Sequence, residues 1–333
     1  MNKSRLLYFL FLGIFISSCS NTRFLPEGEL LYTGANIKVE GKETTSKQKK
    51  ELKNQLKELV RPKPNATILG LRPKLYIYNI AGTPKKDKGF RHWLKNKVGE
   101  APVFYSKVDL DYTKSVLQNF TENSGYFNAR TAADSTRKGK KASAEYLVKP
   151  AKQYAINEVK FPTDSSVIGK AIRNTGRRSL LKKDQPYNLE IIKQERIRID
   201  GRLKEKGYYY FNPDYIIVQV DSTVADHKVD LIVKVKDQTP ELAETPYKIN
   251  KIVVYPNYSI GIDSLKDERK SIKQYKDITI VDSTNMFKPR IFDRALNFSK
   301  NDLYNRTDHN LSLNRLVNLG TFKFVKNQFM VSD

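Results

Sequence analysis

The chain repeats itself at a fixed distance, and this repetition constrains its fold more than any other feature of the sequence. Residues 183–188 (KDQPYN) recur as residues 300–305 (KNDLYN), an offset of 117 positions. Upstream of each copy, residues 154–162 and 247–256 both open with Tyr-x-Ile-Asn and have the composition of strands. Internal similarity of this kind predicts repeated modules, each with a small core of its own.

The helices of these repeats are predicted from their first residues. Asn188 and Asn305 each precede an amphipathic segment and can cap it by accepting a hydrogen bond from a backbone N–H group two or three residues on. We expect the two helices to span residues 189–206 and 307–319. The side chains expected on their buried faces are Leu189, Ile192, Ile199 and Leu203 in the first helix, and Leu313, Leu316 and Val317 in the second.

Glycines mark the ends of the same helices. Gly207 and Gly320 follow the two helices, and Gly125 stands in the same place in an earlier module. Each is expected to cap its helix with a positive φ, where a side chain would be strained. Residues 213–221 and 229–235 then alternate apolar and polar positions, as strands with one buried face do. The module order is therefore strand, helix, helix, strand, strand, which is an α+β layer.

The first part of the chain follows the same order less clearly. A strand is expected at residues 36–39, helices at 45–60 and 109–124, and two strands at about 126–134 and 142–149. Between the helices, residues 62–100 form an insertion that contains Trp93, the only tryptophan, and an apolar run at residues 75–80. We expect that run to pack onto its own module; the alternative is a docking surface.

The first 18 residues have the features of a secretory signal peptide. Lys3 and Arg5 precede an eleven-residue apolar stretch at residues 6–16, which is too short to span a membrane. The stretch ends in Ile-Ser-Ser-Cys, the pattern of a bacterial lipobox, and Cys19 is the only cysteine of the chain. We predict lipidation of Cys19 and a tether over residues 19–28. A transmembrane anchor or a chance cysteine in a signal peptide is the alternative.

The residues after Cys19 predict which membrane the anchor enters. Residues 20–22 (SNT) carry no acidic side chain, so they match neither an inner-membrane retention signal nor an acidic surface-export signal. We therefore expect a lipid-anchored protein on the periplasmic face of the cell outer membrane. The net charge of +24 would indicate nucleic acid in a cytosolic protein. A secreted lipoprotein meets anionic lipid headgroups instead, so we expect a solvated basic surface and no nucleic acid partner; the alternative is a dedicated binding patch.

No residue pattern in the chain predicts catalysis, a cofactor or a metal. One cysteine excludes disulfides and cysteine-based zinc clusters, and His92, His227 and His309 are too far apart in sequence for a local metal motif. Phosphate-binding loops, dinucleotide fingerprints and nucleophile elbows are absent. We expect a protein that is not an enzyme, although a dispersed active site stays open at this stage.

The repeated unit, with helices that end in Gly-Tyr-Tyr or Gly-Tyr-Phe, resembles the POTRA domain. POTRA domains precede the β-barrel in the BamA/TamA superfamily of outer-membrane assembly proteins. The chain looks most like the lipidated TamA-like proteins (TamL) of Bacteroidota. The segments that carry this second resemblance are residues 19–34 (CSNTRFLPEGELLYTG), 68–79 (ILGLRPKLYIYN), 89–94 (GFRHWL), 287–291 (FKPRI), 302–306 (DLYNR) and 313–324 (LNRLVNLGTFKF).

The resemblance implies three tandem POTRA-like β-α-α-β-β modules after the signal peptide and tether. They cover residues 29–150, with the insertion at 62–100, residues 151–240, and residues 241–333. The third is expected to be incomplete, because residues 322–331 align with its second strand and the central last strand would lie beyond residue 333. Leu316 and Val317 would then lack their sheet partner. No barrel is expected in this chain.

The resemblance also implies a function. POTRA domains bind extended segments by β-augmentation, in which a client strand joins the free edge of a sheet. The expected edge in the second module is residues 213–221, with Tyr215, Ile217 and Gln219 as candidate binding residues. The implied partners are unfolded outer-membrane protein clients and a TamB-like protein that spans the periplasm. The alternative is a free-standing lipoprotein that recruits a partner and inserts nothing.

Overall fold

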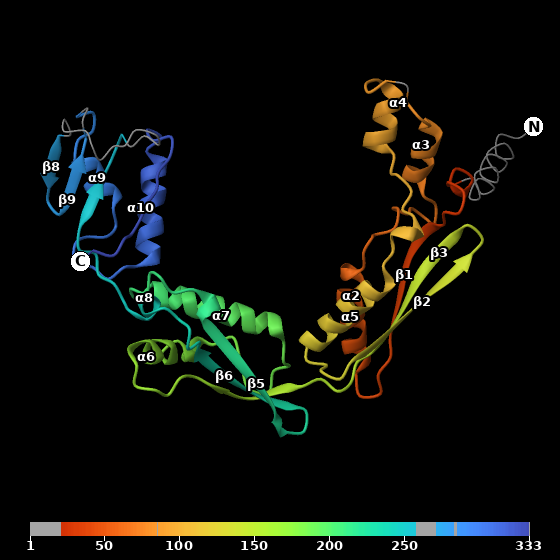
Figure 1. Ribbon diagram of the computed structural model, residues 1–333, viewed down its shortest axis with the longest axis horizontal. Coiled ribbons are helices and arrows are strands. Elements are labelled where there is room, and N and C mark those ends of the chain that lie inside the picture. The colour runs from red at the N-terminus through yellow and green to blue at the C-terminus, as the bar shows by residue number, and fades with distance from the viewer. Residues whose placement is uncertain (1–20, 85, 258–270, 283–284, 333) are drawn as a thin grey trace, which may run out of the picture. The chain divides into compact units, whose positions relative to one another are not determined.

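The computed structural model describes residues 21–84, 86–257, 271–282 and 285–332. The predicted signal peptide and Cys19 lie outside the described residues. The chain divides into two compact units, Met1–Tyr154 and Ala155–Asp333. The first unit holds one module and the second unit holds two. The α+β fold class is confirmed, since each module has a three-stranded sheet with helices (Figure 1).

The first module has the predicted order of elements. Its elements are β1 (Leu31–Val39), α2 (Ser46–Leu59), α5 (Leu110–Asn123), β2 (Arg130–Lys138) and β3 (Lys141–Lys149). In the sheet, β3 lies in the centre, parallel to β1 and antiparallel to β2. Helices α2 and α5 cover one face of this sheet (Figure 1).

Local sequence explains these elements. Thr45 forms a capping box with Gln48 at the start of α2, which satisfies two backbone N–H groups that would otherwise lack partners. In β3 every second side chain is buried, from Ala142 to Val148. They meet Leu52 and Leu56 of α2 in a common core, as the periods of 2.0 and 3.6 residues require.

The insertion forms a helical pair. It contains α3 (Pro73–Ala81), α4 (Phe90–Trp93) and a π-helical turn η2 (Leu94–Val98), followed by η3 (Tyr105–Lys107). The expectation that the run at residues 75–80 packs onto its own module is met only in part. Leu75 is fully buried beside Leu25 and Leu31, whereas Tyr76 and Ile80 are exposed.

The second module repeats the topology of the first. Its elements are β4 (Ala155–Lys160), α6 (Val167–Arg173), η4 (Gly176–Arg178), α7 (Leu189–Lys204), η5 (Pro213–Tyr215), β5 (Ile216–Ala225) and β6 (Lys228–Val235). The central strand β6 is parallel to β4 and antiparallel to β5. Ile199 and Leu203 of α7 are fully buried against this sheet, as their spacing predicted. A short helix, α8 (Glu241–Glu244), leads to the third module.

The third module has the same sheet but a different order along the chain, which corrects one prediction. Its elements are β7 (Ile252–Val254), β8 (Ile272–Tyr275), β9 (Ile278–Val281), α9 (Arg290–Ala295) and α10 (Arg306–Asn318). The central position belongs to β9, parallel to β7 and antiparallel to β8. A hairpin ahead of the helices thus takes the place that the last strand has in the other modules.

Three further predictions about this module were wrong. Residues 322–331 contain no strand; instead Phe322, Val325 and Phe329 pack against the core. Leu316 does not lack a sheet partner, because it is buried in one core with Ile278 and Ile280 of β9. Val317, predicted to face inward, is half exposed.

Candidate functional site

Strand β5 is an edge strand of the second module, as predicted. Among the described residues its only sheet partner is β6, with Ile217 opposite Lys234 and Gln219 opposite Ile232. Tyr215 lies just outside the strand, in η5. The other long side of β5 therefore offers backbone groups that no described strand takes up.

The hydrogen-bond pattern shows which backbone groups point away from the sheet. The carbonyl oxygen of Tyr215 accepts a hydrogen bond from the N–H group of Lys236 at 2.9 Å. Residues of an antiparallel pair alternate between bonding to the partner and pointing away from it. Ile217 and Gln219 share the parity of Tyr215 and direct their backbone groups to β6. Val218 and Val220 direct theirs outward, a distinction that the sequence did not reveal.

The side chains of β5 suit an edge that accepts another strand. Ile217, Val220 and Val224 are each about two-fifths exposed, at 39%, 40% and 39%. Natural edge strands usually carry charges that oppose pairing with another chain. Edge strand β2 of the first module ends in Arg137 and Lys138, whereas β5 carries no charged side chain from Ile216 to Val220, and Asp221 is its only charged residue.

The three predicted helix-capping glycines all have positive φ: 93° at Gly125, 96° at Gly207 and 66° at Gly320. Gly207 also lies at a close contact. A Cβ atom there would approach Pro246 Cβ at 3.1 Å and both Leu303 Cδ2 and the Tyr247 nitrogen at 3.2 Å. The carbonyl oxygen of Gly207 accepts a hydrogen bond from Tyr247 N–H at 2.9 Å. Gly207 therefore both ends α7 and joins the second module to the third.

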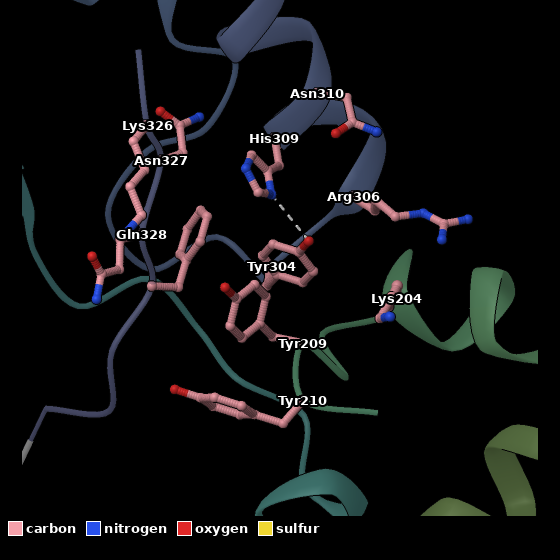
Figure 2. A pocket seen from close by; sticks show the side chains of 11 residues that line it. Lys204, Tyr209, Tyr210, Tyr304, Arg306, His309, Asn310, Lys326, Asn327 and Gln328 are labelled. Atoms are coloured by element: carbon pink, nitrogen blue, oxygen red, sulfur yellow. Dashed lines mark hydrogen bonds between the residues drawn. The ribbon is translucent and has the colours of Figure 1, made fainter. Parts of the chain in front are cut away.

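An aromatic pocket lies at this junction (Figure 2). Its volume is about 610 Å³. The ring of Tyr209 lies edge-on to those of Tyr210 and Tyr304, with centroids 4.9 Å and 4.8 Å away. The ring of Phe329 contacts both Tyr209 and Tyr304, with centroids 5.2 Å and 5.1 Å away. The pocket was not predicted, although the aromatic run after Gly207 was the signal for it.

Two polar groups of the pocket contact each other. Tyr304 Oη and His309 Nδ1 lie 3.2 Å apart (Figure 2). Burial raises the pKa of Tyr304 to about 12 and lowers the pKa of His309, so both are neutral at pH 7. Lys204 and Arg306 lie 3.0 Å and 3.6 Å from the carboxylate of Asp200. The ion pair between Arg306 and Asp200 links the third module to the second.

The described residues hold no cluster of three or more metal-ligating side chains. Within that part of the chain, no helix has the length and apolar character that crossing a membrane requires. The predicted lipidation site, Cys19, lies outside the described residues.

Comparison with known proteins gives fold similarity alone. No family model and no curated protein matches the chain. Among solved structures, the chain is similar to POTRA domains 3–5 of BamA from Haemophilus influenzae, with 14% identity, 92% of each chain covered and a TM-score of 0.39.

Two cyanobacterial structures are also similar. POTRA domains 1–3 of Omp85 from Anabaena share 16% identity over 90% of this chain and 89% of that one, with a TM-score of 0.31. The N-terminal domain of Omp85 from Thermosynechococcus elongatus shares 11% identity over 90% of each chain, with a TM-score of 0.28.

Proposed function

We propose that this chain is the periplasmic, strand-binding region of an outer-membrane protein assembly or translocation factor. The observation that carries the proposal is the free edge of β5, where Val218 and Val220 direct their backbone groups outward between exposed apolar side chains. An extended segment can add to such an edge through main-chain hydrogen bonds. Binding of this kind places few demands on sequence, which suits a protein that handles many unfolded clients.

The cellular setting of the proposal comes from the sequence. The signal peptide and the lipobox at residues 16–19 support a lipid anchor on Cys19 and a body on the periplasmic side of the outer membrane. The motifs at residues 68–79 and 89–94 support membership of the lipidated TamA-like proteins. Unfolded outer-membrane strands are the proposed clients, and a TamB-like periplasm-spanning protein is a proposed partner. The role requires no catalytic residue.

The test distinguishes binding through the backbone N–H groups of β5 from binding through its side chains. In Val218→Pro the outward N–H group is lost, whereas the bonds to β6 remain, since those come from the neighbouring residues. In Val218→Ala the side chain is shortened and the N–H group is kept. The probe is an extended peptide of about ten residues copied from a strand of an outer-membrane barrel protein.

Affinity would be measured by calorimetry and the fold by circular dichroism. We expect Val218→Pro to lower the affinity for the peptide at least about tenfold, the equivalent of one or two main-chain hydrogen bonds. Val218→Ala should stay within about threefold of the parent. Gln219→Pro should instead destabilise the sheet, because its N–H group bonds to β6. Equal affinity of the Val218→Pro and Val218→Ala variants would contradict β-augmentation at this edge.

A further inference from the structure

The insertion of the first module carries a group of exposed apolar side chains. Seven large apolar residues between positions 68 and 93 are exposed: Ile68, Leu69, Leu71, Tyr76, Ile80, Phe90 and Trp93. Single exposed apolar residues are ordinary, but a concentration of them within one element pair marks a contact surface. The strand-binding function proposed above makes no use of them.

Four of these residues lie on the helical pair formed by α3 and α4. Tyr76 and Ile80 are one turn apart on α3 and therefore share a face. Phe90 and Trp93 stack on α4 with ring centroids 6.0 Å apart, and they are 73% and 51% exposed. We call these four residues the insert patch.

Contacts join α3 to the segment that directly follows α4. The Nζ atom of Lys95 lies 4.7 Å from the centre of the Tyr78 ring, and the N–H group of Glu100 donates to the Lys74 carbonyl at 3.0 Å. Gly99 allows close approach of the two segments, because a Cβ there would lie 2.9 Å from Tyr78 Cα.

A turn with exposed apolar side chains lies just before α3. Residues 68–71 form a tight turn in which Ile68 and Leu71 exchange backbone hydrogen bonds of 2.9 Å and 3.0 Å. Leu69 has φ of 50°, a conformation that usually selects glycine or asparagine, and its side chain is 98% exposed. Local folding preference does not explain a leucine at this position.

The charge around the patch is strongly positive. From residue 72 to residue 97 the sequence contains eight Lys or Arg residues and one acidic residue, Asp87. Lys86, Lys88 and Arg91, next to Phe90, are exposed. Exposed tryptophan, phenylalanine and isoleucine flanked by basic residues are typical of a segment that lies in the interface of an anionic bilayer.

The start of the described chain lies against the same helical pair. Asn79 of α3 donates from its side-chain amide to the Asn21 carbonyl at 3.5 Å, and Leu25 packs on Leu75. Cys19 precedes Asn21 by two residues, which span at most about 7 Å of extended chain. A lipid anchor on Cys19 would therefore hold α3 close to a membrane surface.

We propose that the insert patch docks into the headgroup region of a bilayer that carries anionic lipids. Phe90, Trp93, Ile80 and Tyr76 enter the interface, and Lys86, Lys88 and Arg91 contact the headgroups. Docking would orient the first module at the membrane, next to the anchor. The placement of the patch beside the anchor rests on the lipidation proposed above, but lipid binding by the patch does not.

The test uses a chain that begins at Ser20, so its result is independent of acylation. Trp93 is the only tryptophan and reports directly from the patch. The chain is mixed with vesicles of phosphatidylethanolamine containing phosphatidylglycerol, and with vesicles of phosphatidylcholine alone. We expect a blue shift of the Trp93 emission and co-sedimentation with the anionic vesicles, both weakened by salt.

Matched variants assign the binding to the patch. Phe90→Ser should lower partition into the anionic vesicles about tenfold or more, whereas Tyr112→Ser, at an exposed tyrosine of α5, should not. Reversal of Lys86, Lys88 and Arg91 to Glu should lower partition at least about tenfold. Reversal of Lys42, Lys47 and Lys50, which are exposed elsewhere in the same module, should have a smaller effect.

Three results would overturn the proposal. The first is an unchanged Trp93 emission in the presence of anionic vesicles. The second is equal loss of binding in the patch variants and in their matched controls. The third is an intact chain that dimerises in sedimentation equilibrium and becomes monomeric with Phe90→Ser while vesicle binding is unchanged, since the patch would then bind a second copy. The vesicle measurements do not involve β5, so they test this proposal even if peptide binding at β5 fails.

Discussion

At the scale of single residues, Gly207 combines two constraints that usually occur apart. Its φ of 96° disfavours any side chain, and Pro246, Leu303 and Tyr247 lie only 3.1–3.2 Å from the place of a Cβ atom, so they would have to shift to admit one. Gly320 also has positive φ, 66°, but nothing lies within 4 Å of the place of its Cβ. Substitution of Gly320 therefore measures the free-energy cost of the left-handed conformation alone, and substitution of Gly207 measures that cost together with the cost of close contact.

We expect Gly207→Ala to lower the free energy of unfolding by about 2–4 kcal/mol, the sum of the left-handed conformation and an overpacked contact. Gly320→Ala should lower it by about 1 kcal/mol, from conformation alone. Urea unfolding of both variants, followed by circular dichroism, would measure the difference. Equal losses would mean that the neighbours of Gly207 give way without cost.

At the scale of elements, the β8–β9 hairpin decides how the third module is built. Ile278 and Ile280 of β9 are buried against Phe292 of α9 and Leu316 of α10. Each strand of the hairpin has only four residues, which is too short for alternation to stand out in a sequence. The helices of this module thus depend on a sheet formed by a segment that the sequence pattern did not mark.

We expect Ile280→Ala to destabilise the third module by about 2–4 kcal/mol, because it opens a cavity under both helices. Amide hydrogen exchange in α10 should accelerate accordingly. Thr279→Ala, on the opposite face of β9, is the control and should cost less than about 1 kcal/mol. Unchanged protection of α10 in Ile280→Ala would show that the helices do not rest on β9.

At the scale of the whole molecule, the second and third modules form one compact unit. Glu205, just after α7, accepts hydrogen bonds from Thr307 at the start of α10, and Arg306 reaches Asp200 at 3.6 Å. The rings of Tyr209 and Tyr304 add an apolar contact. Strands bound at β5 would thus be presented by a two-module body.

The proposed lipid anchor on Cys19 determines where the whole molecule is located. We expect Cys19→Ser to abolish incorporation of labelled fatty acid in cells and to leave an unprocessed or mislocalised precursor, because the chain has no other cysteine. Membrane fractionation and metabolic labelling would check both effects, with Ser18→Ala as a control that keeps a small residue before the cysteine. Acylation of the Cys19→Ser protein would remove the lipoprotein interpretation.

What the sequence by itself determined is local. The caps of α7 and α10 follow from Asn188 and Asn305, whose side chains accept hydrogen bonds from N–H groups two and three residues on. The buried faces of α7 and β6 follow from spacings of 3.6 and 2.0 residues. These features depend on neighbours within a few positions, so the sequence contains all that decides them.

The tertiary structure decided what depends on distant partners. Pairing with Lys234 and Ile232, not the side chains of β5, determines that Val218 and Val220 point their backbone groups outward. The pocket at Tyr209 needs Phe329, which lies 120 residues later in the chain. The burial of Leu75 in the insertion needs Leu25 and Leu31, which lie more than 40 residues earlier in the chain. Each arises from contacts between segments far apart in sequence, which no local pattern encodes.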